Sequence, residues 1–263
     1  MTYWWVALIV ALACVLEVAA TYLLRKHRKI SALIATLIAA FVLIYKSVEY
    51  IEYLVTDSHV YPIEFSQISY FCYSVITLAG VKFMMPMAGY FAFATGFGNM
   101  LAVLASPDTM AAGFGSWFGL AISLVIHNFL FFGGLLLCCN TVKFSKKTAW
   151  TIPAGILLSI AFILLVRANI FYPDIPSTDN VVFLQILDAS ILEYLMPAEK
   201  ITTGIRVAWY AGVSALLAGT ATGYYALNAA AHRNDAARGD YGWCPGILPV
   251  VLYFVRREKQ RKK

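Results

Sequence analysis

Long apolar runs separated by short polar connections make up most of this chain. Each run holds about 20 or more residues with few charges, which is the length an α-helix needs to cross the hydrocarbon core of a bilayer. The runs cover residues 4–24, 30–54, 60–81, 83–105, 115–139, 148–170 and 202–230. The pattern predicts an all-α fold, a polytopic transmembrane helical bundle of about seven spans.

Composition agrees with this prediction and excludes most soluble classes. The chain is 61% hydrophobic and 13% charged, whereas a soluble domain is typically about 45–50% apolar and about 25% charged. We therefore expect a single transmembrane domain over 1–231. The remaining 232–263 form a basic tail with a short interfacial apolar segment at 243–255, which is too short to cross a bilayer.

The distribution of basic residues predicts the orientation of the bundle. Sixteen of the 20 Lys and Arg residues lie in the connections after the first, third, fifth and seventh runs. Basic connections stay in the cytoplasm, so we expect the N-terminus outside and the C-terminus inside a plasma membrane of bacterial type. The net charge of +6 then reflects topology, and no nucleic-acid partner is expected. The tail at 256–263 is expected to attract anionic inner-leaflet lipids.

Three further segments carry architectural predictions. Apolar residues recur at helical spacing near 181–196, in a stretch shorter than a span, which predicts an interfacial helix over the outer face. The GxxxG patterns at 115–119 and 219–223 predict close helix packing. Five cysteines, an odd number lying mostly in apolar runs, predict neither a disulfide framework nor a metal site.

Polar side chains inside the spans are the candidate functional residues, because an ionisable group at the centre of a span costs about 2.5–3.5 kcal/mol on insertion scales. Nearly all of them fall in the predicted outer half of the spans. They are Lys46, Glu49, Glu64, Ser66, Gln67, Asn99, His127, Asn128 and Arg167. Helical spacing places several on shared faces, so we expect a hydrated cavity open to the outside.

Structural alternatives exist for each of these residues. Lys46 and Arg167 are long enough to reach the outer headgroups, and the glutamates can lie at the interface. A histidine in the middle of a span, such as His127, can be a hydrogen-bonded core residue or a functional base.

Three short motifs resemble the YwaF-like family of seven-span membrane proteins. They are Tyr61-Pro62-Ile63-Glu64-Phe65-Ser66, then Ala105-Ser106-Pro107-Asp108, then Ile126-His127-Asn128. This family includes an animal acyltransferase that acts on ether phospholipids, with a cysteine and a histidine as the proposed catalytic pair. In this chain Ser66 stands at the cysteine position, Glu64 at the motif histidine and His127 at the later histidine.

The resemblance implies lipid acyl transfer or acyl hydrolysis, with membrane lipids as substrates. Ser66 is then the nucleophile, His127 the general base, and Glu64 or Asn128 orients the base. Substrate-binding residues are expected among Lys46, Glu49, Gln67, Asn99 and Arg167, with Lys46 or Arg167 holding a phosphate. No metal or cofactor is expected. The alternatives are a transporter or binding protein for a small anionic solute, and a non-catalytic membrane accessory subunit.

Overall fold

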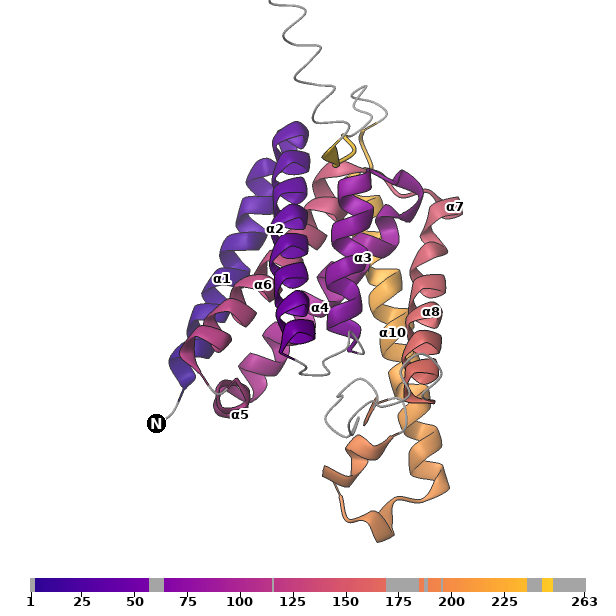
Figure 1. The fold of residues 1–263 in the computed structure, drawn as a ribbon. Coiled ribbons are helices and arrows are strands. Elements are labelled where there is room, and N and C mark those ends of the chain that lie inside the picture. Colours follow the sequence, from indigo (N-terminus) through magenta and orange to yellow (C-terminus); the bar gives the residue numbers. More distant parts are fainter. Residues whose placement is uncertain are drawn as a thin grey trace, which may run out of the picture.

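The computed structural model describes residues 3–56, 64–114, 116–168, 185–186, 189–194, 196–235 and 243–247. Helices are the only regular secondary structure in these ranges, and the long ones lie side by side in one bundle (Figure 1). The predicted all-α fold is therefore confirmed. The direction in which the bundle faces in a membrane stays a prediction.

The long helices follow in chain order. The first half contains α1 (Trp4–Leu23), α2 (Arg28–Val55), α3 (Phe65–Ala79), α4 (Met85–Ala105) and α5 (Pro107–Gly113). The second half contains α6 (Trp117–Leu136), α7 (Lys146–Ala149), α8 (Thr151–Arg167) and α10 (Thr203–Ala231). A π-helical turn, Leu137–Thr141, continues α6, and 3-10 turns cover Leu24–Lys26, Lys82–Met84, Ser190–Tyr194 and Ala198–Lys200.

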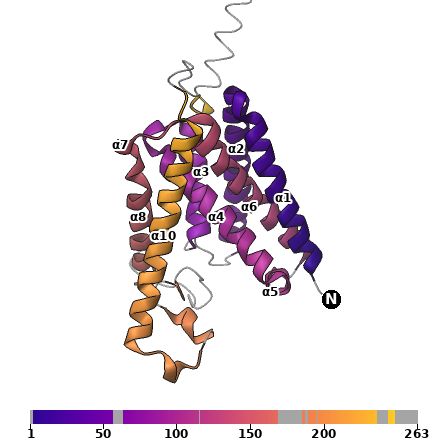
Figure 2. The same ribbon diagram turned by 180° about the vertical axis from the view of Figure 1, so that it is seen from behind.

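Five of the seven predicted spans are helices long and apolar enough to cross a bilayer. They are Trp4–Lys26, Arg28–Val55, Lys82–Ala105, Trp117–Thr141 and Lys146–Val166. These helices indicate a multi-pass membrane protein. The other two predicted spans are also helical, but α3 has only 15 residues, and α10, with 29 residues, is less apolar than the five. Both run along the bundle (Figure 2), and their crossing of the membrane remains a prediction.

The surface of the bundle is apolar where a bilayer would surround it. Large hydrophobic side chains are exposed along α1, α2 and α8, including Leu12, Leu37 and Leu158. Exposed tryptophans lie at the ends of the helices, as in the aromatic belts of membrane proteins. The rings of Trp5 and Trp117 lie next to each other, with centroids 5.4 Å apart and planes tilted by 31°. This arrangement supports the same conclusion as the helix lengths.

The core is built around α4 and α6, whose backbones approach closely through glycine. A Cβ atom added to Gly96 would lie 2.5 Å from the His127 carbonyl oxygen, and one added to Gly134 would lie 2.6 Å from the Phe93 nitrogen. Because real Cβ atoms do not come this close to backbone, only glycine permits this helix contact. The α4–α6 contact in turn fixes the position of His127.

The predicted GxxxG contacts are not the ones that the structure uses. Gly219 and Gly223 lie on an open face of α10, with nothing within 4 Å of an added Cβ atom. Gly119 meets only atoms of the turn that begins its own helix, and residue 115 lies outside the described ranges. The spacing of small residues identifies a possible contact, but the buried face of the helix decides whether it is made.

Other predicted features fall partly or wholly outside the described residues. Of the predicted interfacial helix at 181–196, the structure describes residues 185–186, 189–194 and 196, with a 3-10 turn at Ser190–Tyr194. The Trp209 indole nitrogen of α10 donates to the Ile186 carbonyl at 2.9 Å, so this segment contacts α10. The tail at 256–263 lies outside the described residues.

Candidate functional site

The central histidine of α6 has a defined set of hydrogen-bond partners. Its Nδ1 atom lies 2.8 Å from the Ser123 carbonyl oxygen, one turn earlier in α6. Because a carbonyl only accepts, Nδ1 carries the proton and donates. Nε2 of the neutral ring is then an acceptor, and the Tyr70 hydroxyl lies 3.0 Å from it. His127 is therefore held with its basic nitrogen facing Tyr70.

Tyr70 connects His127 to the predicted nucleophile. Ser66 and Tyr70 are four residues apart in α3, so their side chains share one face of the helix. The Ser66 side chain lies near the Tyr70 hydroxyl. If Tyr70 donates to His127, its oxygen accepts from Ser66. Ser66, Tyr70 and His127 thus follow one another, and the hydrogen bond between Tyr70 and His127 Nε2 is the defined link among them. We call these three residues the contact chain.

A charge pair of α2 lies against this chain. Lys46 Nζ lies 2.6 Å from a Glu49 carboxylate oxygen and 4.6 Å from the centre of the Tyr70 ring. A cation over an aromatic face is attracted by the ring quadrupole. The structure thus brings together Lys46, Glu49, Ser66 and His127 of the predicted site residues, with Tyr70 between them.

Glu64 and Gln67 cap the first turn of α3. They form a capping box at the start of α3, in which the Gln67 side-chain oxygen accepts from the Glu64 backbone nitrogen at 2.9 Å. The Glu64 side chain in turn accepts from the Gln67 backbone. Such a box satisfies amide groups that have no intrahelical acceptor. Glu64 and Gln67 therefore fix the start of the helix that carries Ser66.

In the described part of the structure, Asn99 and Asn128 make no hydrogen bond to Ser66, Tyr70 or His127. The Asn128 amide donates to the Leu124 carbonyl of its own helix at 2.7 Å. The hydrogen bond that orients the His127 ring is accepted by the Ser123 carbonyl oxygen. Asn99 is half-buried in α4. Arg167 ends α8, a helix that packs chiefly on α4, and its side chain lies outside the described part of the structure.

Tyr70 is the functional candidate that sequence reasoning missed. Tyrosine is common in apolar helices, and its type alone gives no signal. The available signal was its spacing, because Tyr70 follows Ser66 by four residues. The partner of Tyr70 lies 57 residues away, so only the fold shows that the Tyr70 hydroxyl meets His127.

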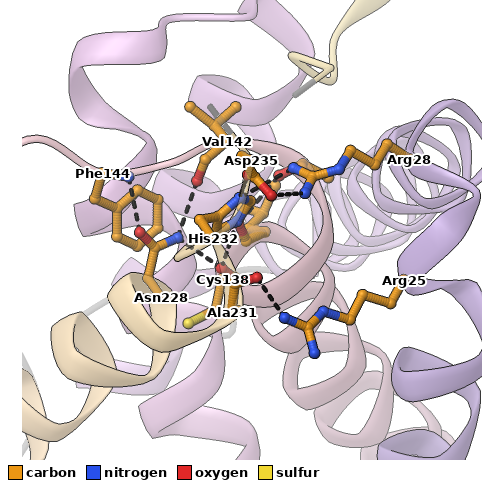
Figure 3. A network of polar contacts seen from close by, with 11 residues as sticks. Arg25, Arg28, Cys138, Val142, Phe144, Asn228, Ala231, His232 and Asp235 are labelled. Atoms are coloured by element: carbon orange, nitrogen blue, oxygen red, sulfur yellow. Dashed lines mark hydrogen bonds and ion pairs between the residues drawn. The ribbon is translucent and has the colours of Figure 1, made fainter. Parts of the chain in front are cut away.

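A second polar network closes the opposite end of the bundle, where α2 begins and α10 ends (Figure 3). Arg28 and Asp235 form an ion pair of 2.5 Å, with both side chains only 10% exposed. His232 Nδ1 lies 2.5 Å from the other Asp235 oxygen and 3.0 Å from an Arg28 guanidinium nitrogen. We call Arg28, His232 and Asp235 the latch, because they join α10 to α2.

The π-helical turn after α6 supplies the acceptors for this end of α10. The Asn228 amide donates to the carbonyl oxygens of Cys138 and Val142, at 2.6 Å and 2.9 Å (Figure 3). Its oxygen accepts from the Phe144 backbone nitrogen at 2.8 Å. His232 Nε2 also lies 3.2 Å from the Cys138 carbonyl. Hydrogen bonds thus hold the end of α10 to two separate elements.

The latch predicts that acid weakens the fold. Burial lowers the pKa of His232 and the nearby Arg28 lowers it further, against the effect of Asp235. Burial alone would raise the pKa of Asp235. The hydrogen bonds and charges of His232 and Arg28 outweigh this effect and lower the pKa. A lowered pKa in the folded state gives stability that is lost as pH falls. The unfolded histidine takes up its proton near pH 6.5, so stability should decline below this pH.

The measurement is the thermal midpoint of the purified protein in detergent between pH 8 and pH 5. We expect the midpoint to fall below pH 6.5, and the fall to be smaller in His232→Gln. His232 Nδ1 lies between an Asp235 oxygen and the Arg28 guanidinium, so protonation of the ring places a second cation against Arg28. A midpoint that rises on acidification would show that His232 is protonated in the folded protein.

Comparison with known proteins gives no relative. No protein-family model, curated protein or solved structure matches this chain.

Proposed function

We propose that this multi-pass membrane protein transfers or hydrolyses the acyl chains of lipids, with Ser66 as nucleophile. The observation that carries the proposal is the hydrogen bond of 3.0 Å between Tyr70 and His127, with Ser66 one turn before Tyr70 on the same helix. A serine acts as a nucleophile only when a base within hydrogen-bond reach takes its proton. Here the base acts through one intervening hydroxyl.

In the proposed reaction, protons move between Ser66, Tyr70 and His127. The Ser66 oxygen attacks the acyl carbonyl carbon while its proton passes to the Tyr70 oxygen and the Tyr70 proton passes to His127 Nε2. The bond to the lipid alcohol breaks, and this alcohol takes a proton back along the same path. The acyl-serine ester then passes its acyl group to an acceptor hydroxyl or to water, which gives transfer or hydrolysis. The Ser123 carbonyl, 2.8 Å from Nδ1, keeps the ring in the tautomer that this requires.

The neighbouring charges fit a supporting role. Lys46 lies against the Tyr70 ring and is paired with Glu49, so its charge is partly compensated. If Lys46 anchors a lipid phosphate, the phosphate replaces Glu49 as the partner of the Lys46 ammonium group. Arg167, Gln67 and Asn99 as substrate contacts, and Glu64 or Asn128 as orienting groups, remain predictions from the sequence.

The resemblance to the YwaF-like family supports the same chemical class. Its acyltransferase member acts on ether phospholipids, and this chain carries Ser66 at the cysteine position of the motif. Membership of this family is part of the proposal. A serine needs stronger activation than a cysteine, because only cysteine is a few per cent ionised at neutral pH.

Acyl exchange on purified protein with fluorescent phospholipid tests the proposal. We expect Ser66→Ala to abolish turnover, and Tyr70→Phe or His127→Ala to lower it by about 10²–10⁴-fold, the range of general-base catalysis. The matched control is Ser74→Ala, a buried serine two turns further along α3. Ser74→Ala should retain the activity of the parent.

A binding measurement on the same variants separates the enzyme from a binding protein. In a binding protein the Ser66 hydroxyl supplies at most one neutral hydrogen bond, about 0.5–1.5 kcal/mol, and Lys46 a stronger charge-assisted contact. Loss of lipid or anion binding in Lys46→Ala, with no acyl exchange in the parent, would eliminate the enzyme. Turnover that survives Ser66→Ala would do the same.

A further inference from the structure

Two cavities meet at the end of the bundle that holds the latch. The first has a volume of about 580 Å³ and lies between the ends of α1, α2 and α10. Its lining contains three cations and one carboxylate, among them Arg25 and Lys26 at the end of α1, and Arg28 paired with Asp235. We call this cavity the basic vestibule. Its charge suits an anion.

The second cavity is an apolar crevice of about 550 Å³ below the vestibule. It lies between α1 and α10, which Figure 2 shows on either side of α4 and α6. Its walls include Val18 of α1, Phe97 of α4 and Leu227 of α10. Tyr22, Arg25 and Ala231 line both cavities, so the crevice and the vestibule are continuous.

The crevice opens toward the place where lipid would lie. Tyr22 at its upper rim is 74% exposed, and Val18 and Leu227, which also line it, are exposed. From Arg25 to Cys14, the deepest lining residue of α1, the helix rises about 16 Å. One leaflet contributes about 15 Å of hydrocarbon. The crevice therefore has the depth of one leaflet.

Two polar groups mark the junction of the cavities. Arg25 donates to the Ala231 carbonyl at 2.6 Å, which holds the guanidinium at the mouth of the crevice. Asn140 lines the crevice and is completely buried; its amide nitrogen donates to the Thr21 carbonyl at 2.8 Å. Its oxygen has no hydrogen-bond donor among the described residues.

We propose that this site binds one anionic phospholipid, with its phosphate in the basic vestibule beside Arg25 and Lys26 and one acyl chain in the crevice. The cations supply charge-assisted contacts to phosphate, and the crevice gives the chain an apolar wall of the right depth. A free phosphate or a polar peptide would leave the crevice unused. The site lies away from Ser66 and His127, so it does not depend on the proposed acyl chemistry.

Equilibrium binding of two fluorescent phospholipids to the full purified chain in detergent tests the site. The probes carry identical acyl chains and either a phosphatidylglycerol or a phosphatidylcholine headgroup. We expect the parent to prefer phosphatidylglycerol by about tenfold or more, the effect of one charge-assisted contact. Arg25→Gln and Lys26→Gln should each reduce this preference, whereas Lys82→Gln, a basic residue outside both cavities, should not.

A second pair of variants on α10 tests the crevice. Ala230→Leu fills the crevice and should weaken the binding of both lipids by a similar factor. Ala215→Leu on the same helix lies outside both cavities and should leave the binding of both lipids unchanged. Glycerol 3-phosphate, which has the phosphate but no chain, should compete poorly. Equal affinity for the two lipids, unchanged binding in Ala230→Leu, or effective competition by glycerol 3-phosphate would each overturn the proposal.

Discussion

Asp235→Asn is expected to lower the free energy of unfolding by about 3–5 kcal/mol, the cost of removing one partner from a buried ion pair. Both side chains of the Arg28–Asp235 pair are nearly buried, and His232 depends on the same carboxylate. The neutral amide keeps the shape of the side chain and removes its charge. The guanidinium of Arg28 then stays in a buried position without the carboxylate that balances it.

Thermal or denaturant unfolding in detergent measures this effect, and a double variant provides the control. Arg28→Met with Asp235→Leu removes both charges and should recover much of the lost stability, because apolar replacements of buried pairs are often neutral. A single Asp235→Asn variant as stable as the parent would show that the latch does not hold α10 to α2.

Gly96→Ala is expected to destabilise the protein by about 1–3 kcal/mol, the cost of overpacking a core, and to displace His127. The added Cβ atom would meet the His127 carbonyl and the Phe131 nitrogen at 2.5 Å. These are backbone atoms, which cannot move aside as a flexible side chain does. The α4–α6 contact must open, and His127 moves relative to Tyr70 of α3.

Gly98→Ala is the matched control on the same helix, because nothing lies within 4 Å of its added Cβ atom. Alanine is the better helix former, so Gly98→Ala should be neutral or stabilising by up to about 1 kcal/mol. Acyl exchange, where present, should fall in Gly96→Ala alone. Equal stability of the two variants would contradict the close α4–α6 contact.

The sequence predicts the helices well because membrane insertion leaves a strong signal. An apolar run of about 20 residues has few alternatives to a helix in hydrocarbon, since every backbone group must be satisfied within the segment. The predicted runs at 4–24 and 83–105 correspond closely to α1 and α4. The close contact predicted at 219–223 is not made within the described part of the chain, because small-residue spacing contains no information on which face of a helix is buried.

The candidate site is only partly visible in the sequence. Ser66 and His127 stand out by residue type, but the Tyr70 hydroxyl between them is found only when α3 and α6 are packed together. The latch gave no signal at all, since Arg28 and Asp235 are 207 residues apart. Contacts of this kind are set by the packing of helices rather than by local pattern.

The length of α10 has a practical consequence for imaging. Its 29 residues span about 43 Å, whereas the hydrocarbon core of a bilayer is about 30 Å thick. Figure 1 shows its first turns extending beyond the ends of α2 and α3. A fiducial protein joined through an unbroken helix at Thr203 would therefore move with the bundle as one rigid body. A chain of 29.1 kDa is small against its detergent micelle. The fused protein adds an external feature by which single particles can be aligned.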